Sequence, residues 1–140
     1  MLHNTIARND NTYGVRITGG SAVALTNTIL VSHTVGITVT TGSTATLQGT
    51  LWGSGTWGND SDWGGDGAIV TGTVNIWGDP AFVDPDGGDY HIGPSSAARD
   101  AGVPAGETDD VDGDPRLGAL DIGADEFVWH AYLPLVTRNY

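Results

Sequence analysis

A repeat of about 22 residues restricts the folds open to this chain more than any other feature of its sequence. Residues 14–18 (GVRIT) recur as 36–40 (GITVT), and residues 20–25 (GSAVAL) recur as 42–47 (GSTATL). A third segment keeps nearly the same period, with NTIA at 4–7, NTIL at 27–30 and GTLW at 49–52. A chain that repeats at this interval is expected to stack identical turns of backbone, because no single repeat can bury its apolar face alone.

Apolar and polar residues alternate inside each repeat, as in Val15/Ile17 and Ile37/Val39. Alternation of period two predicts half-buried strands, and the Gly, Asn and Ser residues between them predict corners. Three short strands and three corners account for one repeat, so we expect an all-β right-handed parallel β-helix (β-solenoid) with about 22 residues per coil. Equivalent residues should then stack. The predicted stacks are an apolar row of Ile6, Ile29 and Leu51 and a ladder of Thr5, Thr28 and Thr50.

The repeat suggests three regions along the chain. Residues 1–78 are expected to form the coils, with a lateral loop rich in Gly and Trp at 52–67. Residues 79–127 are expected to form the last coil and an irregular Asp-rich C-terminal cap, because Asp, Pro and Gly replace the alternating pattern there. Residues 128–140 form an apolar tail expected to contain a strand.

Composition excludes several classes of function. The 140 residues include 17 acidic residues, 5 Arg and no Lys, for a formal net charge of -12, which repels nucleic acid. Cys is absent, which excludes disulfides, thiolate metal sites and a cysteine nucleophile. No apolar run is long enough to span a membrane, and the first residues lack the pattern of a signal peptide. An exported protein with this sequence is therefore expected to be a mature form, a fragment or a product with a mis-assigned start.

The second half of the chain contains a series of ordered blocks. They read DPAFVD at 79–84, GDYHI at 88–92, DVDGDPR at 110–116 and DIGADEF at 121–127. Over residues 79–127 the chain resembles the C-terminal region of bacterial right-handed parallel β-helix proteins of the choice-of-anchor Q type. The resemblance implies an exported, surface-associated protein. It supplies no catalytic residues, because the activity of such proteins is generally unassigned.

Carboxylates are the best candidates for a binding site. Asp110, Asp112, Asp114 and Asp121 offer oxygen ligands for Ca²⁺, although Pro115 rules out an EF-hand loop. The favoured alternative is that these side chains accept hydrogen bonds from their own backbone at tight turns. Arg116 is expected to pair with a carboxylate such as Asp112 or Glu126.

The tryptophans around the Gly-rich segment suggest a second kind of site. Trp52, Trp57 and Trp63 could contact a glycan, but the favoured alternative is that they pin a long loop to the solenoid wall. The four His residues have no HxH or HxxxH spacing, so a zinc site is not indicated. No Ser/His/Asp set can be nominated either.

We expect the two ends of the solenoid to be its functional surfaces. Unpaired strand edges invite another chain, and a head-to-tail contact that does not close builds a filament. We therefore expect a non-catalytic, self-assembling structural protein, located outside the cell or on its surface, whose main partner is a second copy of itself. The alternatives are a carbohydrate-binding adhesin module and a fragment of a polysaccharide lyase, which the absence of Lys disfavours. The residues expected to serve assembly are Leu2, Ile6, Phe127, Val128, Trp129, Tyr132, Leu133 and Leu135.

Overall fold

The computed structural model describes residues 1–9 and 12–129, which form short strands and turns. The elements are β1 (Leu2–Ala7), β2 (Tyr13–Ile17), β3 (Ala22–Val31), β4 (Val35–Val39), β5 (Thr44–Gly53), the 3-10 helix η1 (Gly55–Trp57), β6 (Ser61–Gly64), β7 (Ala68–Thr71), β8 (Asn75–Gly78), β9 (Phe82–Asp84) and β10 (Asp89–Ile92). The expected all-β class is confirmed. No helix in the described part of the chain is long and apolar enough to cross a membrane.

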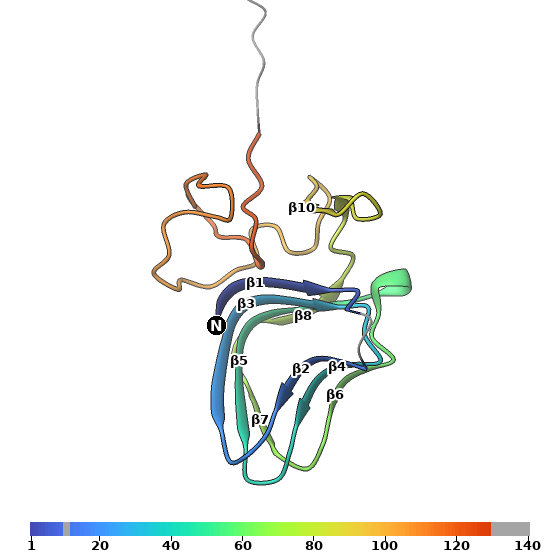
Figure 1. Ribbon diagram of the computed structural model, residues 1–140. Coiled ribbons are helices and arrows are strands. Elements are labelled where there is room, and N and C mark those ends of the chain that lie inside the picture. The colour runs from blue at the N-terminus through green and yellow to red at the C-terminus, as the bar shows by residue number, and fades with distance from the viewer. Residues whose placement is uncertain (10–11, 130–140) are drawn as a thin grey trace, which may run out of the picture.

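The first eight strands wind into a β-solenoid of about three turns (Figure 1). β1, β3, β5 and β7 form one parallel sheet, in which β8 also pairs with β5, and β2, β4 and β6 form a second. β7 pairs with the first half of β5 and β8 with its second half, so one long strand supplies two sides of a coil. Asn27 and Gly49 lie between these halves in β3 and β5, with positive φ angles of 51° and 68°. The predicted coil with three sides is confirmed.

The spacing of the coils differs from the predicted 22 residues. Equivalent positions lie about 24 residues apart on average. Thr5 pairs with Ile29 and Ile6 pairs with Leu30, so the predicted alignment of Ile6 with Ile29 and of Thr5 with Thr28 is wrong by one residue. The physical reason is that five residues separate β1 from β2 in the sequence, whereas three separate β3 from β4. Later strands keep the predicted register, with Thr28 on Thr50.

The interior of the solenoid is filled by side chains stacked from coil to coil. One inward row continues from Ile6 through Leu30 and Trp52 to Trp77, and another from Val15 through Ile37 to Trp63. The central members Leu30, Ile37 and Trp52 are almost completely buried. Burying one aliphatic side chain of this size stabilises a fold by roughly 1.5–3 kcal/mol, so stacking supplies much of the free energy that holds the coils together.

The predicted lateral loop at 52–67 is not present as such. β5 continues to Gly53, η1 forms a short excursion, and β6 returns to pair with β4 as part of the third coil. The glycines of this segment suggested a loop, but they are needed where backbone segments pack closely together. A Cβ at Gly53 would collide with the carbonyl of Trp57, and Gly65 combines a φ of 90° with contact to the Val39 carbonyl.

The segment after β8 (residues 79–127), which we call the lateral segment, covers one side of the solenoid. β9 and β10 form an antiparallel pair, and the rest of residues 79–127 is irregular. Figure 1 shows this segment, in yellow to red, along the face formed by β1, β3 and β8. It adds no further parallel coil, so the expected last coil is not formed. A second hydrophobic cluster lies between the two layers and includes Ile29, Val31 and Leu51 from the strands and Ile92 and Ile122 from the segment.

Candidate functional site

The third coil leaves one edge unpaired among the described residues. We call this the distal edge, and it consists of β6, β7 and β8 on the side facing away from β4 and β5. After Gly78 the chain leaves the stack, and no later strand of the described part continues the parallel ladder. Three large apolar side chains are exposed on these strands: Trp63 (50%), Val70 (53%) and Trp77 (55%).

The two tryptophans of the distal edge are the last members of the inward rows. Trp63 packs edge-to-face against the buried Trp52, with ring centroids 5.9 Å apart. The indole Nε1 of Trp77 donates a hydrogen bond to Asp62 Oδ2 at 2.7 Å. The distal edge therefore exposes the end of the hydrophobic core together with unpaired backbone groups.

The first coil has the complementary edge. We call this the proximal edge, and it consists of β1, β2 and the first half of β3 (residues 22–25), each of which has a parallel partner on one side only among the described residues. Leu2 and Tyr13 are 42% and 37% exposed there. Ile6 is only partly accessible, because it packs against the interior core.

The tryptophans predicted to contact a glycan do not lie on one surface. Trp52 is 1% exposed and Trp57 is 8% exposed, so neither ring can serve as a platform for a sugar, and this prediction is wrong for both. Trp57 instead packs edge-to-face on Phe82 at 4.9 Å, with the Arg8 guanidinium 4.4 Å from its ring centroid. Of the three predicted residues, Trp63 alone is accessible.

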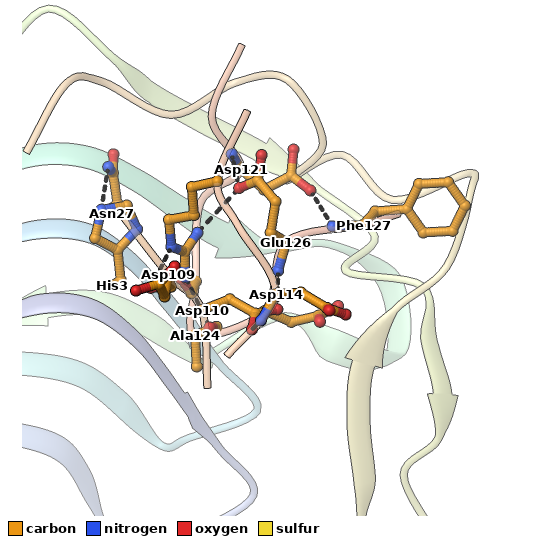
Figure 2. A network of polar contacts seen from close by, with 12 residues as sticks. His3, Asn27, Asp109, Asp110, Asp114, Asp121, Ala124, Glu126 and Phe127 are labelled. Atoms are coloured by element: carbon orange, nitrogen blue, oxygen red, sulfur yellow. Dashed lines mark hydrogen bonds and ion pairs between the residues drawn. The ribbon is translucent and has the colours of Figure 1, made fainter. Parts of the chain in front are cut away.

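A buried ion pair organises the Asp-rich segment (Figure 2). Arg116 Nη1 lies 3.1 Å from Glu126 Oε2, which confirms the expected pairing with Glu126. The same guanidinium donates hydrogen bonds to the backbone carbonyls of Gly123, Ala124 and Asp109. Burial raises the pKa of Glu126, and the charge of Arg116 acts against this shift. Arg116 thus holds together Asp109, the turn at 123–124 and Glu126.

Asp110 acts as a turn former in this network. Its Oδ1 accepts hydrogen bonds from the backbone N–H groups of Asp112 and Asp114, and its Oδ2 accepts one from Glu126. Burial acts to raise the pKa of Asp110, but the three backbone donors outweigh it and hold the pKa below its usual value. The favoured reading of this residue, a carboxylate that caps its own turn, matches these contacts.

Asp121 has the same kind of role in a more buried place. Its Oδ1 accepts a hydrogen bond from the Asp100 N–H at 2.6 Å, and its Oδ2 accepts one from the Phe127 N–H at 2.7 Å. The residue is 2% exposed, and this burial raises the pKa of its carboxyl group. Both oxygens are therefore engaged with backbone.

The predicted calcium ligands do not converge. Among the described residues, the group of three potential ligands whose atoms lie within 4.8 Å of one another is a different one, and it shares only Asp112 with the predicted set. The physical reason is that backbone amides occupy the oxygens of Asp110 and Asp121. The prediction that Asp110, Asp112, Asp114 and Asp121 share an ion is therefore wrong.

The group that does converge consists of His91, Asp112 and Asp125. His91 Nε2 lies 2.5 Å from Asp112 Oδ2, and His91 Nδ1 lies 2.5 Å from Asp89 Oδ1. Hydrogen bonds to Asp112 and Asp89 raise the pKa of His91 to about 9. Asp125 Oδ2 accepts a hydrogen bond from the backbone N–H of Ile92, the next residue along β10. Nitrogen and carboxylate oxygens in this arrangement can hold a proton or a metal ion.

The part of the tail that the structure describes is exposed. Val128 and Trp129 are 39% and 72% exposed, and Phe127 packs edge-to-face on Trp129 at 5.1 Å. The Arg99 guanidinium lies 5.0 Å from the Phe127 ring centroid. The remaining tail residues predicted to serve assembly, Tyr132, Leu133 and Leu135, lie outside the described residues.

Sequence reasoning missed two residues of these sites. His91 and Asp125 come from segments 34 residues apart, so no local spacing links them to each other. Trp77, which also lies beside the Gly-rich segment, follows Trp52 in the same inward row.

Comparisons with protein-family models, with curated proteins and with solved structures find no match to this chain. The resemblance of residues 79–127 to β-helix proteins of the choice-of-anchor Q type thus stays a prediction.

Proposed function

We propose that this protein is a non-catalytic structural protein that assembles head to tail through the ends of its solenoid. The observation that carries the proposal is the distal edge, where Trp63 and Trp77, the last members of two inward rows, are each about half exposed on strands that lack a second neighbour among the described residues. Exposed apolar side chains beside unpaired backbone donors and acceptors form a template for another strand. A strand edge of this kind is expected to bind another strand.

The occupant proposed for the distal edge is the proximal edge of a second copy. All strands within the two solenoid sheets run parallel, so β1 and β2 of a second copy can extend the ladders that end at β8 and β6 in the same direction. The stacking distance is about 4.8 Å, the usual spacing of paired strands. Leu2 and Tyr13 would then cover apolar surface of the next copy. Because the two edges differ, the contact is heterologous and repeats into a filament.

The tail is proposed to contribute to the same assembly. Val128 and Trp129 extend from the lateral segment and are accessible for a contact with a neighbour. An extended apolar segment of this type can add a strand to a sheet edge. We place the filament outside the cell or on its surface, which is supported by the resemblance of residues 79–127 and by an acidic charge that keeps separate filaments apart.

The test uses the full chain over a wide range of concentrations. We expect light scattering to show mass that grows with concentration and electron microscopy to show filaments one solenoid wide. Trp77→Lys places a charge at the exposed end of an inward row on the distal edge and should abolish growth. Leu117→Lys is the matched control, because Leu117 is 75% exposed and belongs to no strand of either edge. A monomer at all concentrations, or equal growth of Trp77→Lys and the original protein, would overturn the proposal.

One observation favours a second function, glycan binding. The exposed rings of Trp63 and Trp77 lie on adjacent sides of the distal coil, and the indole of Trp77 is hydrogen-bonded to Asp62. Aromatic faces beside a carboxylate are suited to the apolar faces and hydroxyl groups of sugars. A glycan array tests this alternative, with Trp63→Ala expected to lose binding and Trp129→Ala to retain it. Binding by both variants, or by neither the original protein nor the variants, argues against it.

A further inference from the structure

We propose that His91, Asp112 and Asp125 bind a first-row transition-metal dication such as Zn²⁺. The three residues come from β10, from the turn at 110–114 and from residues 121–127 of the lateral segment. A bound ion would therefore join parts of the chain that pack irregularly. The inference does not rest on the proposed assembly, because the three ligands belong to no strand of the distal or the proximal edge, although β1 lines the cavity beside them.

The spacing of the ligand atoms fits a metal ion after a small adjustment. One ligand atom from each residue lies within 4.8 Å of the other two. A dication bound at about 2.0–2.2 Å needs ligand atoms roughly 3.0–3.4 Å apart. His91 Nε2 and Asp112 Oδ2 are 2.5 Å apart, and their side chains are 44% and 52% exposed, so they have room to separate.

Asp89 orients His91 for this role. Its Oδ1 accepts hydrogen bonds from both the backbone N–H and the ring Nδ1–H of His91. In the metal-free protein Nε2 holds the other ring proton and donates it to Asp112 Oδ2, and a metal ion would displace this proton to bind Nε2. Metal-binding histidines commonly donate their other ring N–H to a carboxylate, as Nδ1 does to Asp89, and this fixes the direction of the ring.

Asp125 offers an accessible oxygen to a ligand. The residue is 8% exposed, and burial raises the pKa of its carboxyl group. Oδ2 accepts the Ile92 N–H, whereas Oδ1 accepts no hydrogen bond from the described residues and is not one of their buried unpaired atoms. Because Asp125 lines the cavity beside His91, a cation in that cavity can reach Oδ1.

A cavity beside the group leaves space for further ligands. It has a volume of about 490 Å³, and its lining includes His91, Asp125, Tyr90 and Val111 together with residues of β1. Three protein ligands leave at least one coordination position open, which water from this cavity can fill. The imidazole nitrogen favours Zn²⁺ and similar ions over Ca²⁺ and Mg²⁺, which prefer oxygen ligands throughout.

Calorimetric titration of the chelator-stripped, untagged full chain with ZnCl₂ tests the proposal. We expect about one equivalent to bind, and Co²⁺ to give the visible absorption bands of a bound rather than a hydrated ion. His91→Gln and Asp112→Asn should each weaken Zn²⁺ binding at least tenfold. Asp66→Asn, an exposed carboxylate on the solenoid, is the matched control and should bind as the original protein does.

The exposed position of Asp112 keeps the test independent of folding. Circular dichroism of each metal-free variant checks that the strands are retained. No Zn²⁺ binding by the original protein, or equal binding by the original protein, His91→Gln and Asp112→Asn, would overturn the site. Tighter binding of Ca²⁺ than of Zn²⁺ would overturn the assignment to a transition metal.

Discussion

Arg116 and Glu126 form an ion pair whose side chains are 1% and 6% exposed, and the Arg116 guanidinium also donates to three backbone carbonyls. Few charged groups in a small domain are buried so completely. The pair holds the Asp-rich turns in place, because Glu126 Oε2 also accepts the backbone N–H of Asp121. The two side chains have different further partners, so removal of Arg116 and removal of Glu126 should cost different free energies of unfolding.

We expect Arg116→Met to lower the free energy of unfolding by about 3–5 kcal/mol, because it leaves Glu126 buried without its partner. Glu126→Gln should cost less, since the amide oxygen can still accept the Asp121 N–H and Arg116 keeps its backbone carbonyls. Urea unfolding followed by tryptophan fluorescence measures both values. An Arg116→Met variant that loses under about 1 kcal/mol would show that the pair contributes little.

The pKa of His91 predicts how the stability of the metal-free protein depends on pH. Asp112 and Asp89, with Asp125 nearby, raise this pKa to about 9, so the folded protein holds the proton more tightly than the unfolded chain does. The resulting stabilisation is complete below about pH 6.5 and is lost as the pH rises through about 9. Thermal unfolding midpoints in the presence of a chelator should fall over this interval. His91→Gln should remove that part of the pH dependence, and an unchanged slope in the variant would contradict the prediction.

Asn27 links the solenoid to the lateral segment. Its side chain donates to the Val103 carbonyl at 2.6 Å and accepts from the Val103 N–H at 2.8 Å, and its φ angle is positive. We expect Asn27→Ala to be more destabilising than Asn27→Gly, because alanine loses both hydrogen bonds and is strained at this φ, whereas glycine loses only the bonds. Denaturant midpoints of the two variants test the order, and the reverse order would contradict the structure at this corner.

The acidic charge predicts that assembly depends on salt. Each copy carries a formal net charge of -12, so stacking brings like charges together. At about 0.1 M salt the screening length is about 10 Å, and it shortens as salt is added. Light scattering at fixed protein concentration should therefore increase with NaCl and reach a plateau. Growth that decreases with NaCl would indicate attraction between opposite charges and would contradict stacking driven by apolar edges.

The fold could be predicted because the pattern of strands and turns repeats along the sequence. The alternation at Val15/Ile17 and Ile37/Val39 identifies the strands, and the repeat identifies their neighbours. The register of the first coil could not be predicted, because the NTI segments at 4–6 and 27–29 are 23 residues apart, whereas the paired residues of β1 and β3 are 24 apart. The connection between β1 and β2 is two residues longer than the one between β3 and β4, which lengthens the first repeat from 22 to 24 residues.

The candidate sites were less predictable for a different reason. Asp110, Asp112 and Asp114 alternate in sequence, but Asp110 turns inward to bind backbone amides while Asp112 faces His91. The hydrogen bonds that Asp110 makes within this turn determine which carboxylate oxygens remain free to bind a ligand. The pairing of Arg116 with Glu126 was predictable, because Arg116 is the one basic residue between positions 100 and 130.

The path of the lateral segment has a consequence for the length of the solenoid. Ala97 donates its N–H to Asp79, next to the last coil, while Ala124 donates its N–H to Thr5 in the first. The lateral segment therefore contacts both ends of the stack, so its length limits the number of coils that one chain can form. An inserted coil would move Asp79 about 4.8 Å further from Thr5 and would break one of these attachments. A chain with more than three turns would therefore need a longer lateral segment, whereas the proposed stacking of separate copies would not.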